Sequence, residues 1–326
     1  MDLDVVFLGT SASAPTARRG LASLLVRRGG DRLLFDCGEG TQRQLLRSSI
    51  GLVDLEEIFV THFHADHYLG LPGLLKTFSL RARDEPLRVY GPPGLGELYN
   101  ALGRVIGRLT YPVELVELRA GDRLERDGYE ICAFPVDHRV PALGYALVEA
   151  ERPGRFDDAK ADELGVPFGP ERGVLQRGEP VTLADGRTIQ PEELVGEPRP
   201  GRTVVYTGDT RPADAVPMLF PGADLLIHEA TFGEDERERA LDTGHSTAAE
   251  AAGIARDAAV SLLAITHVSP RYLASDLVEE AQAIFPGTIL PRDFDIVELP
   301  FRERGEPALV KGGARPERTR EETPAT

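Results

Sequence analysis

The segment His62-Phe63-His64-Ala65-Asp66-His67 places three histidines and one aspartate within six residues, in a chain with seven histidines. The apolar run Glu57–Val60 before it predicts a buried strand, and Leu69–Leu75 after it predicts the entry to a helix. Side chains two residues apart point the same way in an extended chain, whereas the aspartate and the last histidine follow where the chain turns. This spacing predicts ligands for two adjacent metal ions on a strand-to-helix loop.

Further histidines and an aspartate follow predicted strands elsewhere in the chain. They are His138, Asp209, His228 and His267. Because loops at one edge of an α/β sheet assemble its sites, we expect these residues to converge on the first segment. Imidazole nitrogen and carboxylate oxygen are donors that Zn²⁺ favours. For His228 we favour a buried structural histidine over a ligand.

Predicted strands alternate with predicted helices along most of the chain. The strands cover residues 3–8, 22–27, 32–36, 57–60, 87–90, 113–118, 203–206, 224–227 and 262–265. One helix is predicted to start at residue 42, and a second, after the 62–67 segment, to end near residue 83. Two more are predicted to cover 95–106 and 247–259. This alternation argues for an α/β fold, and hairpins at 22–36 and 123–136 argue that each sheet is mixed.

Residues 152–200 differ in composition, with seven glycines, seven prolines and no histidine. A helix at 157–164 and a hairpin at 181–189 predict a partly ordered arm that projects from the core, with a disordered linker as the alternative. The charged tail from residue 303 predicts disorder. We therefore expect one domain over 1–302 with an inserted arm at about 152–200, followed by a tail at 303–326.

The amino-acid composition limits the classes of protein to which this chain can belong. The content of 41% hydrophobic and 28% charged residues is ordinary for a globular protein, and no apolar run approaches the roughly 18 residues that span a bilayer. The start, Met1–Asp4, lacks a basic signal region. We expect a cytoplasmic protein that has no membrane partner, in which Cys37 and Cys132 are free buried thiols.

The net charge of −16 argues against a non-specific nucleic-acid coat but does not exclude nucleic acid as a substrate. Arginines cluster early in the chain, at Arg18, Arg19, Arg27, Arg28, Arg32, Arg43 and Arg47. Two interpretations stay open for them, a local basic patch or a solvated arginine-rich surface.

The segment 62–67 resembles the His-x-His-x-Asp-His signature of metallo-β-lactamase-fold hydrolases, and further motifs are similar to those of the ribonuclease Z family. They are Phe7–Thr10, Asp36–Gln42, Gly70–Leu74, Asp137–Pro141 with Gly144-Tyr145, Tyr206–Thr210, His228–Thr231, Gly244–Thr247, and Thr266-His267 with Pro270–Tyr272. The resemblance runs in register over residues 3–300. It implies a four-layer αβ/βα sandwich of two mixed sheets flanked by helices, with a protruding exosite arm.

The resemblance also implies a site. One metal would be held by His62, His64 and His138, and the other by Asp66, His67 and His267, with Asp209 bridging both. The implied ions are two Zn²⁺ per subunit, and Mn²⁺ or Fe²⁺ also suits these ligands. Asp66 would accept a proton, or else act as a ligand alone. His245, held by Glu229, would donate a proton, or else cap the following helix.

The implied activity is an endoribonuclease that removes the 3′ trailer from tRNA precursors with metal-activated water, leaving a 3′-hydroxyl on the tRNA and a 5′-phosphate on the trailer. The family implies a homodimer whose arm grips the tRNA elbow. The candidate contacts are Arg152, Arg155, Lys160 and Arg172. The alternatives are a small-molecule phosphodiesterase or arylsulfatase-like hydrolase, and a catalytically silent RNA-binding member.

One motif departs from the family. Members that process precursors without an encoded CCA end often carry Pro-x-Lys-x-Arg-Asn after the first strand. This chain has Pro15-Thr16-Ala17-Arg18-Arg19-Gly20, so Ala17 and Gly20 replace the lysine and the asparagine. The cleavage position relative to the discriminator base therefore stays open.

Overall fold

Two large β-sheets organise the chain in the computed structural model, which describes residues 2–52 and 55–312. Within those residues one sheet has eight strands in the order β17-β16-β1-β2-β3-β4-β5-β6, and the other has seven in the order β15-β14-β13-β12-β9-β8-β7. The strands of the first are β1 Leu3–Gly9, β2 Ser23–Arg28, β3 Asp31–Phe35, β4 Glu57–Phe59, β5 Leu87–Gly91, β6 Val113–Glu117, β16 Ile296–Glu298 and β17 Ala308–Val310. Those of the second are β7 Arg123–Arg126, β8 Tyr129–Pro135, β9 Leu143–Glu149, β12 Thr203–Tyr206, β13 Leu225–Glu229, β14 Leu262–Thr266 and β15 Thr288–Ile289.

Both sheets are mixed, as predicted. In the first, β1 pairs antiparallel with β2 and β16, while β3 to β6 run parallel. In the second, β12 to β15 run parallel. The two-residue turn Asp127-Gly128 makes β7 and β8 an antiparallel hairpin.

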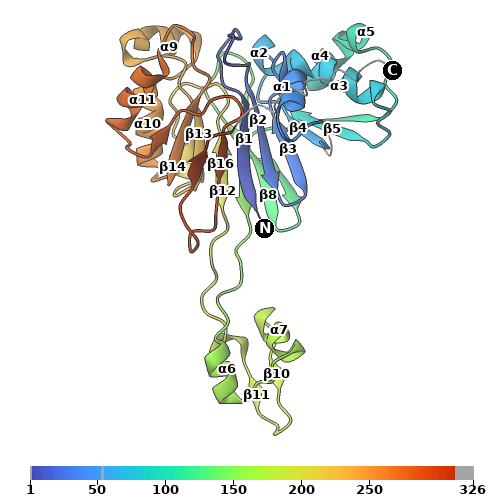
Figure 1. The fold of residues 1–326 in the computed structure, drawn as a ribbon, viewed down its shortest axis with the longest axis vertical. Coiled ribbons are helices and arrows are strands. Elements are labelled where there is room, and N and C mark those ends of the chain that lie inside the picture. Colours follow the sequence, from blue (N-terminus) through green and yellow to red (C-terminus); the bar gives the residue numbers. More distant parts are fainter. Residues whose placement is uncertain (1, 53–54, 313–326) are drawn as a thin grey trace, which may run out of the picture. The chain divides into compact units, whose positions relative to one another are not determined.

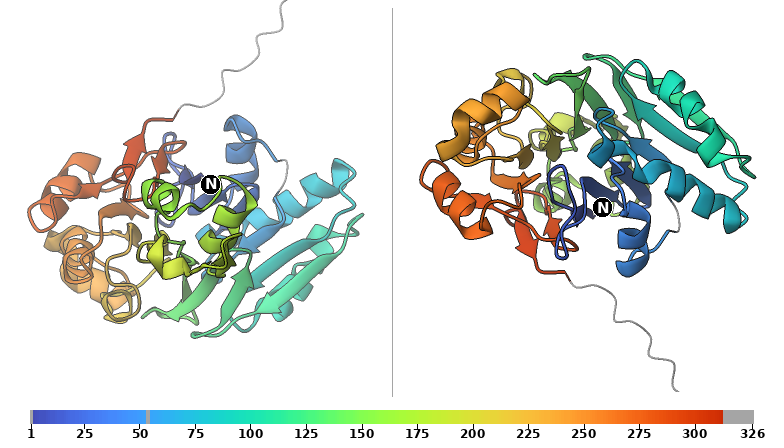
Figure 2. Two further views of the ribbon diagram at one scale, coloured as in Figure 1. Left: turned by 90° about the horizontal axis from the view of Figure 1, so that it is seen from below. Right: turned by 90° about the horizontal axis from the view of Figure 1, so that it is seen from above.

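Helices cover the outer faces of both sheets (Figures 1 and 2). The first sheet carries α1 Thr41–Arg47, α2 Ala65–Tyr68, α3 Gly70–Leu80, α4 Leu95–Ala101 and α5 Gly103–Ile106, and the second carries α8 Ala215–Leu219, α9 Arg237–Thr243, α10 Ala248–Asp257 and α11 Ala274–Gln282, with the 3₁₀ turn η2 at Glu234–Glu236. The apolar face of α3, with Leu71, Leu74 and Leu75, is buried against the strands. None of the helices in the described residues is long and apolar enough to cross a membrane.

The inner faces of the two sheets meet through aromatic side chains. Phe59 of β4 stacks on Phe35 of β3 at 5.0 Å and meets Tyr145 of β9 at 5.5 Å between ring centroids. The hydroxyl of Tyr145 donates to the carbonyl oxygen of Val60 at 2.9 Å. This contact ties the second sheet to the residue just before the 62–67 segment.

The chain divides into two compact units. Unit 2 takes residues 125–130 and 148–202, and unit 1 takes the rest of the described chain. Unit 2 contains α6 Asp158–Leu164, α7 Pro170–Gln176, the hairpin β10 Val181–Thr182 with β11 Thr188–Ile189, and a 3₁₀ turn η1 at Pro191–Glu193. Its small core consists of Ala161, Val166, Leu175, Val181, Ile189 and Leu194. The predicted helix and hairpin are therefore confirmed, while α7 was missed.

A buried ion pair supports the start and end of unit 2. Arg202 donates through Nε and Nη2 to the two carboxylate oxygens of Glu149 at 2.7 and 2.8 Å. Nearby, Arg152 and Arg199 exchange two backbone hydrogen bonds of 2.8 Å each. The two chain segments of unit 2 thus run side by side at this point.

Three predictions of local structure were wrong. His228 and Glu229 lie inside β13, because its pairing with β14 continues to Glu229 opposite Thr266. The predicted helix over 95–106 is interrupted at Leu102, between α4 and α5. Within the tail expected to be disordered, Ala308–Val310 form β17 paired with β16, and the tail beyond residue 312 lies outside the described residues.

The close approach of α3 to the loop after β3 leaves no room for a side chain at Gly70. A Cβ atom on Gly70 would lie 2.0 Å from the carbonyl oxygen of Gly38 and 2.8 Å from that of Cys37. Because both are backbone atoms, we expect Gly70→Ala to destabilise the fold by at least about 1–3 kcal/mol in chemical denaturation. Gly103→Ala, which meets nothing within 4 Å, is the matched control and should be neutral or slightly stabilising. Equal stability of the two variants would contradict this packing.

Candidate metal centre

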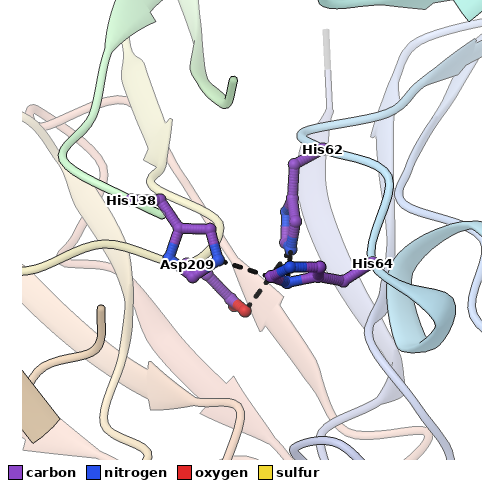
Figure 3. A group of neighbouring side chains, drawn as sticks. All are labelled: His62, His64, His138 and Asp209. Carbon is purple, nitrogen blue, oxygen red and sulfur yellow. Dashed lines mark hydrogen bonds and ion pairs between the residues drawn. The ribbon is translucent and has the colours of Figure 1, made fainter. Parts of the chain in front are cut away.

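Three histidines and one aspartate from distant parts of the chain meet in the first ligand group (Figure 3). They are His62, His64, His138 and Asp209. Nδ1 of His64 lies 3.0 Å from Nε2 of His62 and 3.2 Å from Nε2 of His138. Oδ2 of Asp209 lies 3.6 Å from Nε2 of His62. Ligand atoms that share one tetrahedral Zn²⁺ lie about 3.3 Å apart, so this spacing fits one ion.

A second group lies beside the first and shares Asp209. Nε2 of His267 is 3.2 Å from Nε2 of His67 and 3.2 Å from Oδ2 of Asp66. Oδ1 of Asp209 lies 3.2 Å from Nε2 of His67 and 3.4 Å from Nε2 of His267. The two carboxylate oxygens of Asp209 therefore face different groups.

Asp66 and His67 reach this point from the one-turn helix α2, since a helix presents consecutive residues to different sides. The other ligand candidates sit just past strand ends. His62 follows β4, His138 follows β8, Asp209 follows β12, and His267 follows β14 directly. The structure thus brings together all seven residues that we predicted as metal ligands.

Hydrogen bonds at the far side of four imidazole rings fix their tautomers. Nδ1 of His138 lies 2.7 Å from the carbonyl oxygen of Gly244, which can only accept, so Nδ1 carries the proton. The same holds for His67 at 2.8 Å from the Asp36 carboxylate. Two rings contact hydroxyl groups that donate to carboxylates and so must accept from the ring: His62 with Thr61 at 3.0 Å, and His267 with Thr231 at 2.9 Å.

These tautomers leave the unprotonated Nε2 lone pairs of His67 and His267 facing each other across 3.2 Å, an arrangement that repels unless a cation lies between them. Oδ1 of Asp209 also favours a bound cation, because this oxygen is buried with no hydrogen-bond partner among the described residues. A buried carboxylate oxygen without a donor is strongly unfavourable, and a bound cation removes that cost. The residues present therefore fit divalent metal ions.

The pKa shifts of the histidines in the centre also favour the binding of divalent metal ions. Burial lowers the pKa of His62, His64 and His138, and neighbouring imidazoles lower the pKa of the first two further, so these rings stay neutral as metal ligands must be. Burial also lowers the pKa of His67, but the carboxylates of Asp209 and Asp36 raise it well above its ordinary range. The negative field that would hold a proton there also favours a metal cation.

Asp36, which we did not predict as a site residue, anchors the centre from behind. It is fully buried and has a positive φ of 58°, and its carboxylate accepts from four groups. These donors are the backbone N–H and hydroxyl of Thr61, Nδ1 of His67 and the hydroxyl of Tyr206. The sequence signal was its position in the glycine-rich loop after β3, and its contacts with residues far along the chain could not be read from that loop.

Glu229 and His245 form a pair next to the metal-ligand groups. Oε1 of Glu229 lies 2.8 Å from Nδ1 of His245, and the carboxylate also accepts from Thr210 N–H and from the Thr231 hydroxyl. Burial lowers the pKa of His245, but the charge of Glu229 outweighs it and raises the pKa to about 9. Glu229 therefore favours the protonated form of His245.

A cavity of about 820 Å³ opens onto His245 and onto the metal-ligand groups. His64, Asp66 and His245 line it, together with Arg139, Arg239 and Arg271. Thr247 caps the N-terminus of α10, and its hydroxyl accepts from Glu250 N–H in a capping box, so the helix-cap alternative for His245 is not supported. His245 is left free to face the cavity.

His228 lies apart from the ligand groups. It is buried in β13, and its Nδ1 lies 2.8 Å from the backbone oxygen of Glu229. This position agrees with the structural role that we favoured. Cys37 and Cys132 are both buried, as expected.

The fold and this centre define a member of the metallo-β-lactamase superfamily, and the sequence profile of the Metallo-beta-lactamase superfamily matches residues 17–274. Ribonuclease Z of Myxococcus xanthus is 50% identical over 305 residues, which cover 92% of this chain and 99% of the relative. Ribonuclease Z of Natronomonas pharaonis is 50% identical over 306 residues, again covering 92% and 99%. The crystal structure of human tRNase Z, short form, superposes with a TM-score of 0.66 at 29% identity, covering 91% of this chain and 99% of that one. The chain belongs to the ribonuclease Z family of endoribonucleases.

The buried position of Asp36 predicts its effect on metal binding. Asp36→Asn removes the charge that holds the Nδ1 proton of His67, so we expect divalent-metal affinity to fall about 10–100-fold. Tyr206→Phe removes only one donor to the same carboxylate and should weaken binding less. Competition with a chromogenic chelator measures both variants, and wild-type affinity in Asp36→Asn would contradict the anchoring role.

Proposed function

We propose that the chain is a zinc-dependent endoribonuclease that removes the 3′ trailer from tRNA precursors, leaving a 3′-hydroxyl on the tRNA and a 5′-phosphate on the trailer. The observation that carries the proposal is the convergence of two ligand groups on the buried Asp209 carboxylate. The relatives named ribonuclease Z and the human tRNase Z structure support the choice of substrate.

His62, His64 and His138 would hold one ion, Asp66, His67 and His267 the other, and Asp209 both. When bound, such a pair of divalent cations supplies Lewis acidity toward the phosphate and toward the attacking water. Zn²⁺ matches the imidazole-rich donor set, and Mn²⁺ or Fe²⁺ also suits it.

The protein groups divide the proton transfers between them. Asp66 accepts a hydrogen bond of 2.8 Å from Ser13 N–H. Burial raises the pKa of Asp66, but its interactions with the neighbouring His267 and His67 lower it below the ordinary range. As an ionised carboxylate lining the cavity, Asp66 is placed to accept the proton of the attacking water. His245, protonated and held by Glu229, is placed to donate a proton to the departing 3′-oxygen.

Unit 2 would contact the tRNA away from the metal centre. Arg172, one of the predicted contacts, is buried and bonded to Asp158, Asp162 and the carbonyl oxygen of Val166, so it serves the fold of the unit. Arg155 and Lys160 line a shallow cavity of unit 2 and, together with Arg152, remain the candidates for contact with RNA. The homodimer, the cytoplasmic location and the cleavage position stay predictions from the sequence.

The backbone pairing of Arg152 with Arg199 permits a sharp test of unit 2. Because these residues are directly hydrogen-bonded, residues 153–198 can be replaced by an Asn-Gly turn. We expect this variant to lose cleavage of a 3′-extended tRNA precursor by at least about tenfold in kcat/KM while it still hydrolyses bis-p-nitrophenyl phosphate.

His138→Ala is the control, because loss of a metal-ligand candidate should abolish activity on both substrates, as a chelator should on the wild type. Efficient precursor processing by the turn variant would overturn the role of unit 2. A wild-type protein that hydrolyses only the small ester would favour the small-molecule hydrolase instead.

A proton-donating role of His245 can be distinguished from a structural role by comparing substrates whose leaving groups do and do not need a proton. His245→Ala should lower kcat on the RNA precursor by about 10²–10⁴-fold, because the departing ribose oxygen needs a proton. An ester that releases p-nitrophenolate needs no such proton, and its hydrolysis should change far less. Glu229→Gln should give the same pattern in weaker form. An equal loss on both substrates would show that His245 acts only through the structure of the site.

A further inference from the structure

Arg211 lies two residues after Asp209 and outside both metal-ligand groups. Its side chain is 22% exposed and contacts two distant parts of unit 1. Nη1 of Arg211 donates to Oδ1 of Asp137 at 3.1 Å, and Nε donates to the carbonyl oxygen of Leu241 at 2.8 Å. One side chain therefore connects three segments that are far apart in the sequence.

The backbone of the same segment is paired with Asp137. Arg211 N–H donates to the carbonyl oxygen of Asp137 at 2.7 Å, and Asp137 N–H donates to the hydroxyl of Thr210 at 3.1 Å. Because His138 is the next residue, these bonds fix the ligand candidate that follows β8 relative to the one that follows β12. They do not involve the Arg211 side chain and remain when that side chain is changed.

The segment 241–246, which carries His245, is attached at both ends to the residues that follow Asp209. At its start, Arg211 holds the last turn of α9. At its end, the fully buried hydroxyl of Ser246 donates to the carbonyl oxygen of Thr210 at 2.7 Å. The position of His245 thus depends on contacts that lie on either side of it.

The bond to Leu241 matters more for position than for the stability of the fold. The carboxylate of Asp137 is 58% exposed, and such a surface ion pair contributes only about 0.2–1 kcal/mol. The last carbonyl groups of a helix lack donors within the helix, and Gly244 N–H approaches that of Leu241 only to 3.3 Å. A guanidinium group at this point satisfies the carbonyl oxygen and interacts favourably with the helix dipole.

We propose that Arg211 is a positioning residue that determines where His245 lies relative to the metal centre. Thr210 N–H donates at 3.0 Å to Oε1 of Glu229, the same oxygen that contacts Nδ1 of His245 at 2.8 Å. Residues 209–211 therefore contact the metal-ligand groups, the carboxylate that holds His245 and the segment that carries it. The inference rests on the proposed function, in which His245 donates a proton, a transfer in which Arg211 itself takes no part.

The first test compares Arg211→Gln with Arg256→Gln. Arg256 lies in the last turn of α10 and pairs with Asp257 at 2.8 Å, so the control removes an arginine from a helix end that carries no site residue. For Arg211→Gln we expect kcat on a 3′-extended tRNA precursor to fall about 10–100-fold, because a displacement of about 1 Å suffices for such a loss. KM should change by less than about twofold, and bound metal, measured by elemental analysis, should stay at the wild-type level.

Combination with His245→Ala separates positioning from a general loss of structure. If Arg211 acts through His245, Arg211→Gln should lower kcat by less than about twofold when the imidazole is already absent. A series of aryl phosphodiesters whose leaving groups have rising pKa values gives a second measurement. Arg211→Gln and His245→Ala should both steepen the decline of the rate along this series, as loss of a proton donor does.

Unchanged kcat in Arg211→Gln, or an equal loss in Arg256→Gln, would overturn the proposal. The same would follow from an equal effect of Arg211→Gln with and without the His245 ring, or from a loss of bound metal, because Arg211 would then act on the site as a whole. If the wild type cleaves no precursor, the proposed function fails. The aryl series still decides between the two outcomes for Arg211, since an unaltered decline in the variant contradicts a role through His245.

Discussion

The Asp209 carboxylate imposes the constraint on which the site depends. It is buried between two sets of imidazole nitrogens, and one of its oxygens has no donor in the described structure. Around it, tautomers fixed by Gly244, Asp36, Thr61 and Thr231 leave lone pairs pointing at one another. A protein alone cannot satisfy this arrangement at low cost, because the Nδ1 donors of these rings are committed elsewhere. Cations between the rings resolve both problems together.

The groups behind the ligand candidates come from strand ends on both sheets. Asp36 follows β3, Thr61 follows β4, and Thr231 follows β13, so the packing of one sheet on the other determines where the rings can lie. The aromatic contacts of Phe59 with Phe35 and Tyr145 fix that packing just beneath the centre. In the function that we propose, substrate selection would fall to unit 2 rather than to the centre, since one fold can serve many chemistries.

Much of this was predictable from the sequence, for identifiable reasons. Strand ends with histidines share one edge of a sheet, so the ligand candidates could be gathered without coordinates, and the family resemblance supplied their grouping. Asp36 was missed because its partners, His67 and Tyr206, are distant in sequence. The end of β13 was misplaced because polar His228 and Glu229 resemble a loop, although both are buried and hydrogen-bonded. The contact of Arg211 with Leu241 could not be predicted, since only the tertiary fold places these residues together.

Anomalous diffraction from crystals of the purified wild-type protein, collected on both sides of the zinc absorption edge, tests the central claim most directly. The account predicts two peaks per chain, one among His62, His64 and His138 and one among Asp66, His67 and His267, with the Asp209 carboxylate between them. A single peak, or two peaks that do not contact Asp209, in zinc-supplemented crystals would contradict it.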